Sequence, residues 1–231
     1  MIPARERSGP ATAGDVVLEL AGLEKSFVEP AGPQRVLAGV DLTVEPGELV
    51  TVAGRSGSGK TTLLTIVAGW DQPDAGSVIV LGGAVPPDRL RWNDVAVLPQ
   101  SLGLLDELTV AENVALPLRL HDVANADEPA TLMRRLGIDH LAGRLPNEIS
   151  LGEQQRTALA RAVVVRPRLV LADEPVAHQN REWAEAMVFV LRRLTDEGCA
   201  CVLASHNEVA FEDADRVLEL KHGQLGPLSR S

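Results

Sequence analysis

The sequence predicts an α/β protein with a mostly parallel sheet and an inserted helical subdomain. Short runs along the chain have the apolar pattern of strands, and several are apolar almost throughout. Such strands are typical of a parallel sheet that is covered on both faces. Between two groups of these runs, residues 101–165 show helical periodicity instead. A chain of 231 residues, without an internal repeat or a long linker, is long enough to bury the core of one such domain.

The strand predictions rest on runs of apolar and β-branched residues that are bounded by turn residues. In chain order the runs are VVLEL, ELVTVAG, SVIVLG, VAVLP, RLVLAD, CACVLAS and RVLEL. The run CACVLAS holds both cysteines, Cys199 and Cys201. They lie two positions apart on one face of the predicted strand, a poor geometry for a disulfide, so we expect two small core residues.

Helices are predicted where the apolar spacing changes. The helical subdomain is expected to open at Thr109, which with Glu112 has the T-x-x-E spacing of a capping box. Two further helices are predicted from DEPATLMRRLG and GEQQRTALARAVV. The later segment REWAEAMVFVLRRLTDEG predicts a helix that gathers apolar side chains on one face, namely Met187, Val190, Leu191 and Leu194.

These elements set the expected boundaries of the chain. The first residues include basic side chains but no apolar stretch of a signal peptide, so we expect a disordered lead-in. No run reaches the ~18 apolar residues of a membrane span, and we expect a cytoplasmic protein. The expected parts are a lead-in at 1–15, one domain at 16–225 with its core in 16–100 and 166–225 and the helical subdomain in 101–165, and a tail at 226–231.

The formal charge of the chain limits its partners. At −10, it argues against non-specific binding to nucleic acid or to anionic lipid. An acidic protein can still hold a phosphate, because a local cradle of backbone N–H groups binds an anion whatever the net charge. We therefore expect no nucleic-acid partner.

The segment GRSGSGKTT follows a predicted strand and opens the apolar helix TTLLTIVAG. It fits the phosphate-binding pattern G-x-x-x-x-G-K-[ST] in the strand–loop–helix context that the pattern requires. Its glycines let the backbone wrap a phosphate closely, and the N–H groups of the loop and of the helix N-terminus point at it. Lys60 supplies positive charge for the β- and γ-phosphates, and Thr61 supplies a hydroxyl ligand for Mg²⁺. The predicted phosphate-binding residues are Gly54, Arg55, Ser56, Gly57, Ser58, Gly59, Lys60, Thr61 and Thr62.

A second acidic signal lies downstream, where the apolar run RLVLADEP ends in Asp173 and Glu174. Acids at the carboxyl end of a central strand stand where open α/β sheets bind ligands. Asp173 can hold Mg²⁺ through water, and Glu174 can orient or deprotonate an attacking water. A strand that ends in Asp-Glu commonly only starts a helix, and the phosphate loop upstream favours the catalytic interpretation.

Further segments complete an ordered set. Phe27 lies in EKSFVEP, Gln100 in VLPQS, Ser150 and Gly152 in ISLGEQQR, and His206 in LASHN. Each alone has an ordinary structural explanation. In this order and spacing, the chain resembles the nucleotide-binding subunits of ATP-binding cassette (ABC) transporters over nearly all of residues 16–222.

The resemblance implies a P-loop NTPase (RecA-like) core with an N-terminal antiparallel β region, and it implies roles for the matched residues. Phe27 would stack on adenine, and Ser150 and Gly152 would hold the ATP of a second subunit in a head-to-tail dimer. The implied catalytic residues are Lys60, Gln100, Glu174 and His206. The implied ligands of Mg²⁺ are Thr61, Gln100 and Asp173.

Within this family, the segments LLTIVAGWDQPDAGSVIVLG and ENVALPLRL most resemble the macrolide-efflux, lipoprotein-release and cell-division subgroup. The resemblance implies an ATPase, peripheral on the inner face of the membrane, that drives an integral-membrane transporter subunit. An ATP-gated regulator that moves no substrate remains the alternative, because it would use the same ATPase. A soluble factor in translation or DNA repair is disfavoured, since such proteins carry two cassettes or a long coiled-coil insert.

The chain departs from the family pattern at the surface that would face the second subunit. Leu151 stands where the signature has glycine, and Glu153 stands where it has an uncharged amide. After Glu174 and Pro175 the family continues T-[SG]-x-L-D, and this chain reads VAHQN, so Asn180 replaces an aspartate. We expect this surface to bind the partner's ATP less well, and the ATPase to be slow as a result. The subunit could form a homodimer or a heterodimer with another ABC ATPase.

The leucine-rich segment SLGLLDELTVAENVALPL follows Gln100. Exposed apolar surface on a soluble protein commonly marks an interaction site. We expect a groove in this segment, with Leu104 and Leu105 in it, that receives a short cytoplasmic helix of the membrane subunit. About half of the leucines are expected to fill the subdomain core instead.

Overall fold

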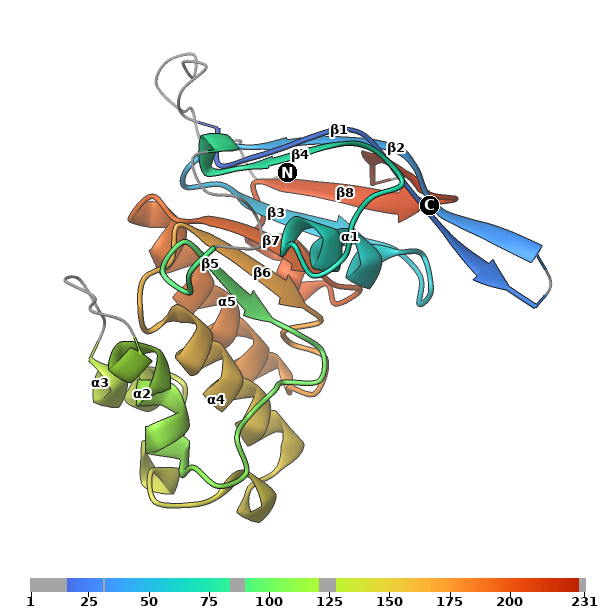
Figure 1. The fold of residues 1–231 in the computed structure, drawn as a ribbon. Coiled ribbons are helices and arrows are strands. Elements are labelled where there is room, and N and C mark those ends of the chain that lie inside the picture. The colour runs from blue at the N-terminus through green and yellow to red at the C-terminus, as the bar shows by residue number, and fades with distance from the viewer. Residues whose placement is uncertain (1–15, 31, 84–89, 121–127, 229–231) are drawn as a thin grey trace.

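The structure, a computed structural model, describes residues 16–30, 32–83, 90–120 and 128–228. The predicted lead-in at 1–15 and the last residues of the predicted tail lie outside this part of the chain. Two sheets and a set of helices form the molecule, and the N-terminal sheet lies above the central one in Figure 1. Among the helices that the structure describes, none is both long and apolar enough to cross a membrane.

The central sheet has six strands in the order β5-β6-β7-β3-β8-β9. Its neighbouring strands are parallel except for the last pair, β8 and β9. Every residue of β3, β6 and β7 is buried, which confirms the prediction of strands covered on both faces. The strands are β3 (Leu49–Ala53), β5 (Val95–Leu98), β6 (Leu169–Asp173), β7 (Ala200–Ala204), β8 (Arg216–Lys221) and β9 (Gln224–Pro227).

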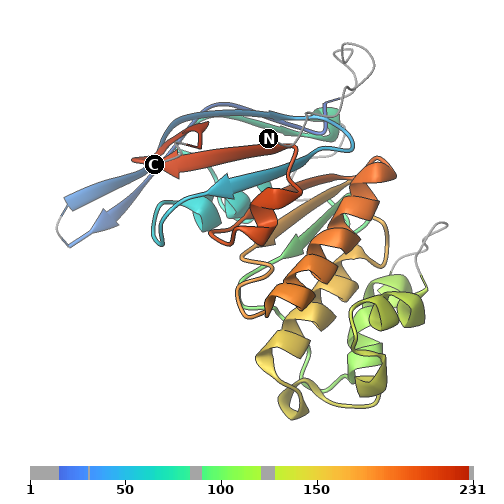
Figure 2. The ribbon, with the colours of Figure 1, turned by 180° about the vertical axis from the view of Figure 1, so that it is seen from behind.

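The N-terminal region forms a separate antiparallel sheet in the order β2-β1-β4, as the resemblance implied. Its strands are β1 (Leu18–Glu29), β2 (Gly32–Val44) and β4 (Ala75–Val80). The strand β1 is longer than the predicted run VVLEL, and β1 and β2 form a hairpin that projects beyond the sheet in Figures 1 and 2. Neither β2 nor β9 was predicted from the sequence. The strand β9 is short and partly exposed, whereas β2 ends in an alternating run, VDLTV, whose Val40, Leu42 and Val44 are buried and which could have been read as a strand.

The helices divide between the two faces of the central sheet. One core cluster joins α1 (Lys60–Val67) and the antiparallel sheet to one face. The other cluster joins α4 (Leu151–Val163), α5 (Arg181–Asp196) and the helical subdomain to the opposite face. Figure 2 shows α4 and α5 side by side along that face. The predicted apolar face of α5 is confirmed, because Met187, Val190, Leu191 and Leu194 are all buried.

The helical subdomain lies between β5 and β6 in the chain. It contains α2 (Val110–Leu120), α3 (Pro129–Arg135) and the short 3-10 helices η3 (Asp139–Leu141) and η4 (Pro146–Glu148). The predicted capping box is confirmed, since the backbone N–H of Thr109 donates to the Glu112 carboxylate and Thr109 Oγ1 accepts from the backbone N–H of Glu112. Two other short elements are η1 (Leu81–Gly83) and α6 (Val209–Glu212).

Candidate functional site

The glycine-rich loop runs from the end of β3 to the first turn of α1. Two of its glycines are required by close contacts. A Cβ atom at Gly54 would lie 2.5 Å from Ser58 Oγ and 2.8 Å from the main-chain oxygen of Leu220, and one at Gly59 would lie 2.7 Å from Val36 Cγ1. Gly59 also takes a left-handed conformation at φ 104° just before α1 begins.

The tip of this loop is open to solvent. Arg55, Ser56 and Gly57 are exposed, and Gly57 has left-handed backbone at φ 77° with open space beside it. Thr62, on the first turn of α1, is half-buried. The tip therefore offers accessible backbone and side-chain groups next to the start of a helix, where backbone N–H groups have no helical partner.

Lys60 lies under the loop with only 8% of its side chain exposed. Its ammonium donates to the main-chain oxygen of Gly54 at 2.8 Å. The same nitrogen lies 3.6 Å from Glu174 Oε1, on the strand end across the cleft. The loop and the acid that were predicted separately are therefore joined by an ion pair.

The residues proposed as Mg²⁺ ligands also come together. Thr61 Oγ1 donates to Asp173 Oδ2 at 2.6 Å, which joins α1 to the end of β6. Gln100 lines a pocket of about 480 Å³ together with Thr61 and Asp173. Burial raises the pKa of the Asp173 carboxyl, and the hydrogen bond from Thr61 opposes that rise. A hydroxyl, a carboxylate and an amide oxygen are hard oxygen donors that suit Mg²⁺.

Glu174 and His206 form a pair at the carboxyl ends of β6 and β7. Nδ1 of His206 lies 2.9 Å from Glu174 Oε1, and Ser205 Oγ donates weakly to the other carboxylate oxygen at 3.4 Å. Glu174 has a left-handed backbone at φ 50°, which is strained for a residue with a side chain. Only 12% of its side chain is exposed, whereas His206 is largely in solvent. The Glu174 carboxylate therefore lies between Lys60 and His206, and the His206 imidazole remains accessible to solvent.

The loop also contains an unsatisfied group that suits an anionic ligand. Among the described residues, Ser58 Oγ is buried without a hydrogen-bond partner. A buried hydroxyl without a partner costs free energy, and a phosphate oxygen would satisfy it. The orphaned hydroxyl, the glycine cradle and the Lys60 ammonium therefore fit a phosphate group.

Phe27 lies on the hairpin of β1 and β2. It pairs with Gln34, two residues before Val36, whose side chain meets the loop at Gly59. The ring is 41% exposed, and Lys25 Nζ lies 5.4 Å from its centroid. The ring is therefore open for stacking beside the loop.

Ser150 and Gly152 do not join this cluster. They lie at the N-terminal end of α4, at the foot of the molecule, and both views place that end far below α1. Leu151 between them is 49% exposed. Ser150 is exposed and Gly152 is half-buried, at an end of α4 that lies apart from α1.

Glu153 is engaged by its own helix. The backbone N–H of Ser150 donates to Glu153 Oε2 at 2.8 Å, and the Ser150 hydroxyl donates to the same oxygen at 2.7 Å. The hydrogen bond from the Ser150 hydroxyl is the main cause that lowers the pKa of Glu153. These contacts form a capping box. The Ser150 hydroxyl, which the resemblance expects to bind a phosphate, therefore already donates its proton to the Glu153 carboxylate.

Asn180 has a structural role as well. Its side-chain oxygen accepts the backbone N–H of Trp183 at 2.9 Å and caps the N-terminus of α5. An aspartate at this position would cap the helix in the same way. The replacement thus keeps the cap and removes a charge.

Sequence reasoning missed the buried side chain that holds the loop after Gln100. Arg161, on α4, donates to the main-chain oxygens of Leu102 at 2.7 Å and Gly103 at 2.6 Å. Its guanidinium lies 5.7 Å from the Trp92 ring, and burial lowers its pKa. The only signal in the sequence was an arginine inside an otherwise apolar helical pattern.

Comparison with known proteins identifies the family. The model of the ABC transporter family matches residues 37–177, which is more than half of the chain. The chain belongs to the ABC transporter family. It is 39% identical to the lipoprotein-releasing system ATP-binding protein LolD 2 of Caulobacter vibrioides, over 91% of this chain and 97% of that protein.

Two other similarities extend the comparison. The chain is 35% identical to the macrolide export ATP-binding/permease protein MacB of Azoarcus sp.. The alignment covers 92% of this chain and 34% of MacB. The ATP-binding cassette MJ0796, solved as a dimer in a post-hydrolysis state bound to ADP and Pi, superposes with a TM-score of 0.80. That alignment has 27% identity and covers 93% of this chain and 100% of the cassette. The chain is therefore an ABC ATPase, which binds and hydrolyses ATP, and the predicted fold class and family are confirmed.

Proposed function

We propose that this ATPase uses Mg-ATP to drive an integral-membrane protein of the lipoprotein-release or efflux type. The observation that carries the proposal is the assembly of Lys60, Thr61, Asp173, Glu174 and His206 at the ends of β3, β6 and β7. The names of the relatives support the type of work, since LolD serves lipoprotein release and MacB serves macrolide export. The cell-division-like regulator is not favoured by these relatives.

The site performs hydrolysis by holding and orienting groups around the γ-phosphate. Lys60 and the loop N–H groups bind the phosphates. Thr61, Asp173 and Gln100 would hold Mg²⁺, which when bound neutralises charge on the β- and γ-phosphate oxygens. Glu174 orients the attacking water and accepts its proton, and His206 fixes that carboxylate through the 2.9 Å contact. Phe27 stacks on the adenine.

A second subunit completes the site in this proposal. Ser150 is exposed and Gly152 is half-buried at the N-terminal end of α4, which Figure 1 shows apart from α1, so they would serve the ATP bound by another chain. The dimeric state of the MJ0796 cassette supports such an arrangement. Either a second copy or another ABC ATPase subunit can provide the facing surface.

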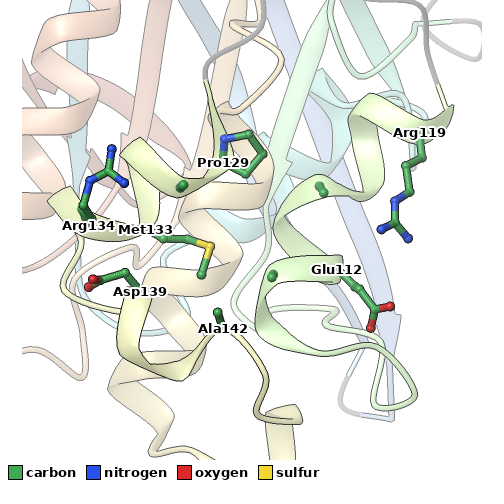
Figure 3. Close-up of a pocket in the computed structure, with 10 residues that line it drawn as sticks. Glu112, Arg119, Pro129, Met133, Arg134, Asp139 and Ala142 are labelled. Carbon is green, nitrogen blue, oxygen red and sulfur yellow. The ribbon is translucent and has the colours of Figure 1, made fainter.

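The membrane partner would dock in a groove of the helical subdomain. A cavity of about 360 Å³ lies between α2, α3 and η3. Figure 3 shows Met133 pointing between the two helices, with Arg134 and Asp139 on one side and Glu112 and Arg119 on the other. Small side chains complete its lining, namely Ala111, Ala115, Ala130 and Ala142, together with Pro129.

This groove overlaps the predicted segment only in part, and the predicted role of Leu104 and Leu105 stays a prediction. The segment after Gln100 does contribute, through α2, but Leu104 and Leu105 do not line the cavity. Leu104 packs against the core, and the side chain of Leu105 is 43% exposed outside the lining of this cavity. Alanines let a helix backbone approach closely, and the mixed charges at the rim can pair with polar ends of a short helix.

We place the chain on the cytoplasmic face of the membrane through this contact.

The groove is tested with charged substitutions on its wall. Detergent-solubilised membranes are passed over immobilised wild type, Ala130→Glu and Leu105→Glu, and captured integral-membrane proteins are identified. Because a carboxylate in the cavity would have to be desolvated, we expect Ala130→Glu to lose the partner at least tenfold while Leu105→Glu keeps it. Equal capture by all three proteins, each with wild-type ATPase activity, would show that the partner binds elsewhere.

A further inference from the structure

Two glutamine side chains tie the segment after Glu174 to the N-terminal end of α4. Gln155, buried on α4, donates from Nε2 to the main-chain oxygen of Glu174 at 2.7 Å. Gln179 donates from Nε2 to Gln155 Oε1 at 3.0 Å and to the main-chain oxygen of Gly152 at 2.9 Å. An unbroken series of hydrogen bonds therefore runs from the catalytic acid to the outward-facing end of α4.

The orientation of the Gln179 amide is fixed by a cation. Arg156 donates from Nη1 to Gln179 Oε1 at 2.8 Å, and its guanidinium stacks 4.3 Å from the Trp183 ring. Because a guanidinium only donates, the oxygen of Gln179 must face Arg156 and its NH₂ group must face Gly152. The oxygen and both hydrogens of the amide are then used. The Gln179 amide is therefore held in one orientation, although Nε of Arg156 is buried without a hydrogen-bond partner.

The packing around Gly152 is correspondingly close. A Cβ atom at Gly152 would lie 3.1 Å from the main-chain oxygen of His178 and 3.4 Å from Gln179 Nε2. The backbone N–H of His178 also donates to Gln155 Oε1, at 3.3 Å. The segment after Glu174 and the start of α4 therefore have little room to move independently.

We propose that Gln179 is a positioning residue that locks Glu174 to the end of α4 that faces the second subunit. When the ATP of the second subunit binds Ser150 and Gly152, the lock transmits that contact to the main chain of Glu174 in this subunit. The family pattern has leucine where this chain has Gln179, and leucine can make none of these hydrogen bonds. The inference rests on the proposed dimer.

The substitution Gln179→Leu tests the lock, because it keeps a similar volume and removes the three hydrogen bonds. We expect kcat for ATP to fall about threefold to tenfold, the effect of losing one to two net hydrogen bonds. KM for ATP should stay within about twofold, since the Lys60 loop is untouched. The matched control is Gln224→Leu on the exposed strand β9, which should leave both constants unchanged.

Two further variants separate positioning from folding. Gln179→Glu keeps the contact to Arg156 but cannot donate to Gly152, so it should lower kcat as Gln179→Leu does. Gln155→Met breaks the same series at its other end, and we expect the double variant with Gln179→Leu to lose no more than the worse single variant. Unchanged kcat in a folded Gln179→Leu protein, or losses that multiply in the double variant, would overturn the lock.

The failure of the dimer can be distinguished from the failure of the lock. Sedimentation of Glu174→Gln with ATP reports the dimer directly, because hydrolysis is blocked. A protein that stays monomeric there would overturn the homodimer, and with it the role of the lock in turnover by the isolated chain. A protein that dimerises, but whose kcat is unchanged by substitution of Gln179, would overturn the lock alone.

Discussion

Replacing Glu153 with glutamine should strengthen the surface that faces the second subunit. The Glu153 carboxylate now accepts both the backbone N–H and the hydroxyl of Ser150. Glutamine can keep the capping box through its side-chain oxygen, as in the S-x-x-Q form. The change therefore removes a negative charge and weakens the hold on the hydroxyl, with little loss of helix geometry.

The size of the effect follows from distances in the structure. A phosphate oxygen that hydrogen-bonds to Ser150 Oγ lies within about 5 Å of the carboxylate, which is 2.7 Å from that hydroxyl. At an effective dielectric constant of about 20–40, two unit charges at this distance repel by about 2–3 kcal/mol. Salt and solvent at this partly exposed position reduce the repulsion to about 1–2 kcal/mol. Removing it should tighten the ATP-bound dimer about fivefold to thirtyfold per site.

The assay is sedimentation of the Glu174→Gln protein with saturating ATP, with and without Glu153→Gln. We expect Glu153→Gln to lower the dimer dissociation constant at least about fivefold, the lower limit for one site. In the protein that keeps Glu174, the same substitution should raise ATPase activity several-fold. The matched control is Glu112→Gln, which removes the same kind of capping carboxylate on α2 and should not change dimerisation of the isolated chain. An unchanged dissociation constant in Glu153→Gln, alone and combined with Leu151→Gly, would refute the reasoning and make both substitutions neutral.

Two other predictions follow from the same contacts. Lys60→Ala should abolish tight binding of labelled ATP, whereas Glu174→Gln should keep binding and lose about 10²–10⁴-fold in turnover, the usual contribution of a positioned general base; unchanged turnover would remove Glu174 from that role. Glu153 also has a pH signature: its pKa is lowered in the folded state by Ser150, so its stabilising effect is full above the unfolded pKa of about 4.3 and is lost as pH falls through the lower folded pKa. Urea unfolding should therefore show wild type more stable than Glu153→Gln by about 0.3–1 kcal/mol at pH 6–8, with a difference that shrinks as the pH falls below about 4. A difference that stays constant down to the lowest pH at which the protein is folded would contradict the assignment.

The parts of the fold that could be predicted are those where one physical signal dominates. The strands β3, β6 and β7 are buried on both faces, so their sequences are apolar and unmistakable. The strand β9 is short and partly in solvent, and its side chains carry little pattern. The strand β2 does alternate between buried and exposed residues at 40–44, so that part of it could have been predicted. The glycine-rich loop was predictable because its spacing is fixed by close backbone contacts such as those at Gly54 and Gly59.

The site was predictable to the extent that it depends on spacing along the chain. Ser150 and Glu153 are three positions apart, as Thr109 and Glu112 are, so the capping-box rule that predicted the start of α2 also predicts the Ser150–Glu153 contact. The lock through Gln179 could not be predicted in that way. It depends on which side chains of α4 and of the segment after β6 meet in space, and no local pattern encodes that meeting.

In the proposed dimer, the two halves of an ATP site are built from different elements, and the departures from the family pattern at Leu151, Glu153 and Asn180 fall in only one of them. The groups proposed to hold a chain's own ATP come from the β3–α1 loop and the ends of β6 and β7, where Lys60 pairs with Glu174 and Thr61 donates to Asp173. The groups that would meet the second subunit come from the start of α4, where Glu153 occupies the Ser150 hydroxyl. In a homodimer, both sites would combine a complete first half with the same altered second half, and both would be slow. With a partner that carries an unaltered signature, the site at Lys60 of this chain would be the complete one, and the partner's own loop would face Glu153. Restoring Glu153→Gln should therefore raise turnover at both sites of a homodimer but only at the partner's site of such a heterodimer, which makes the same substitution a test of which assembly the chain forms.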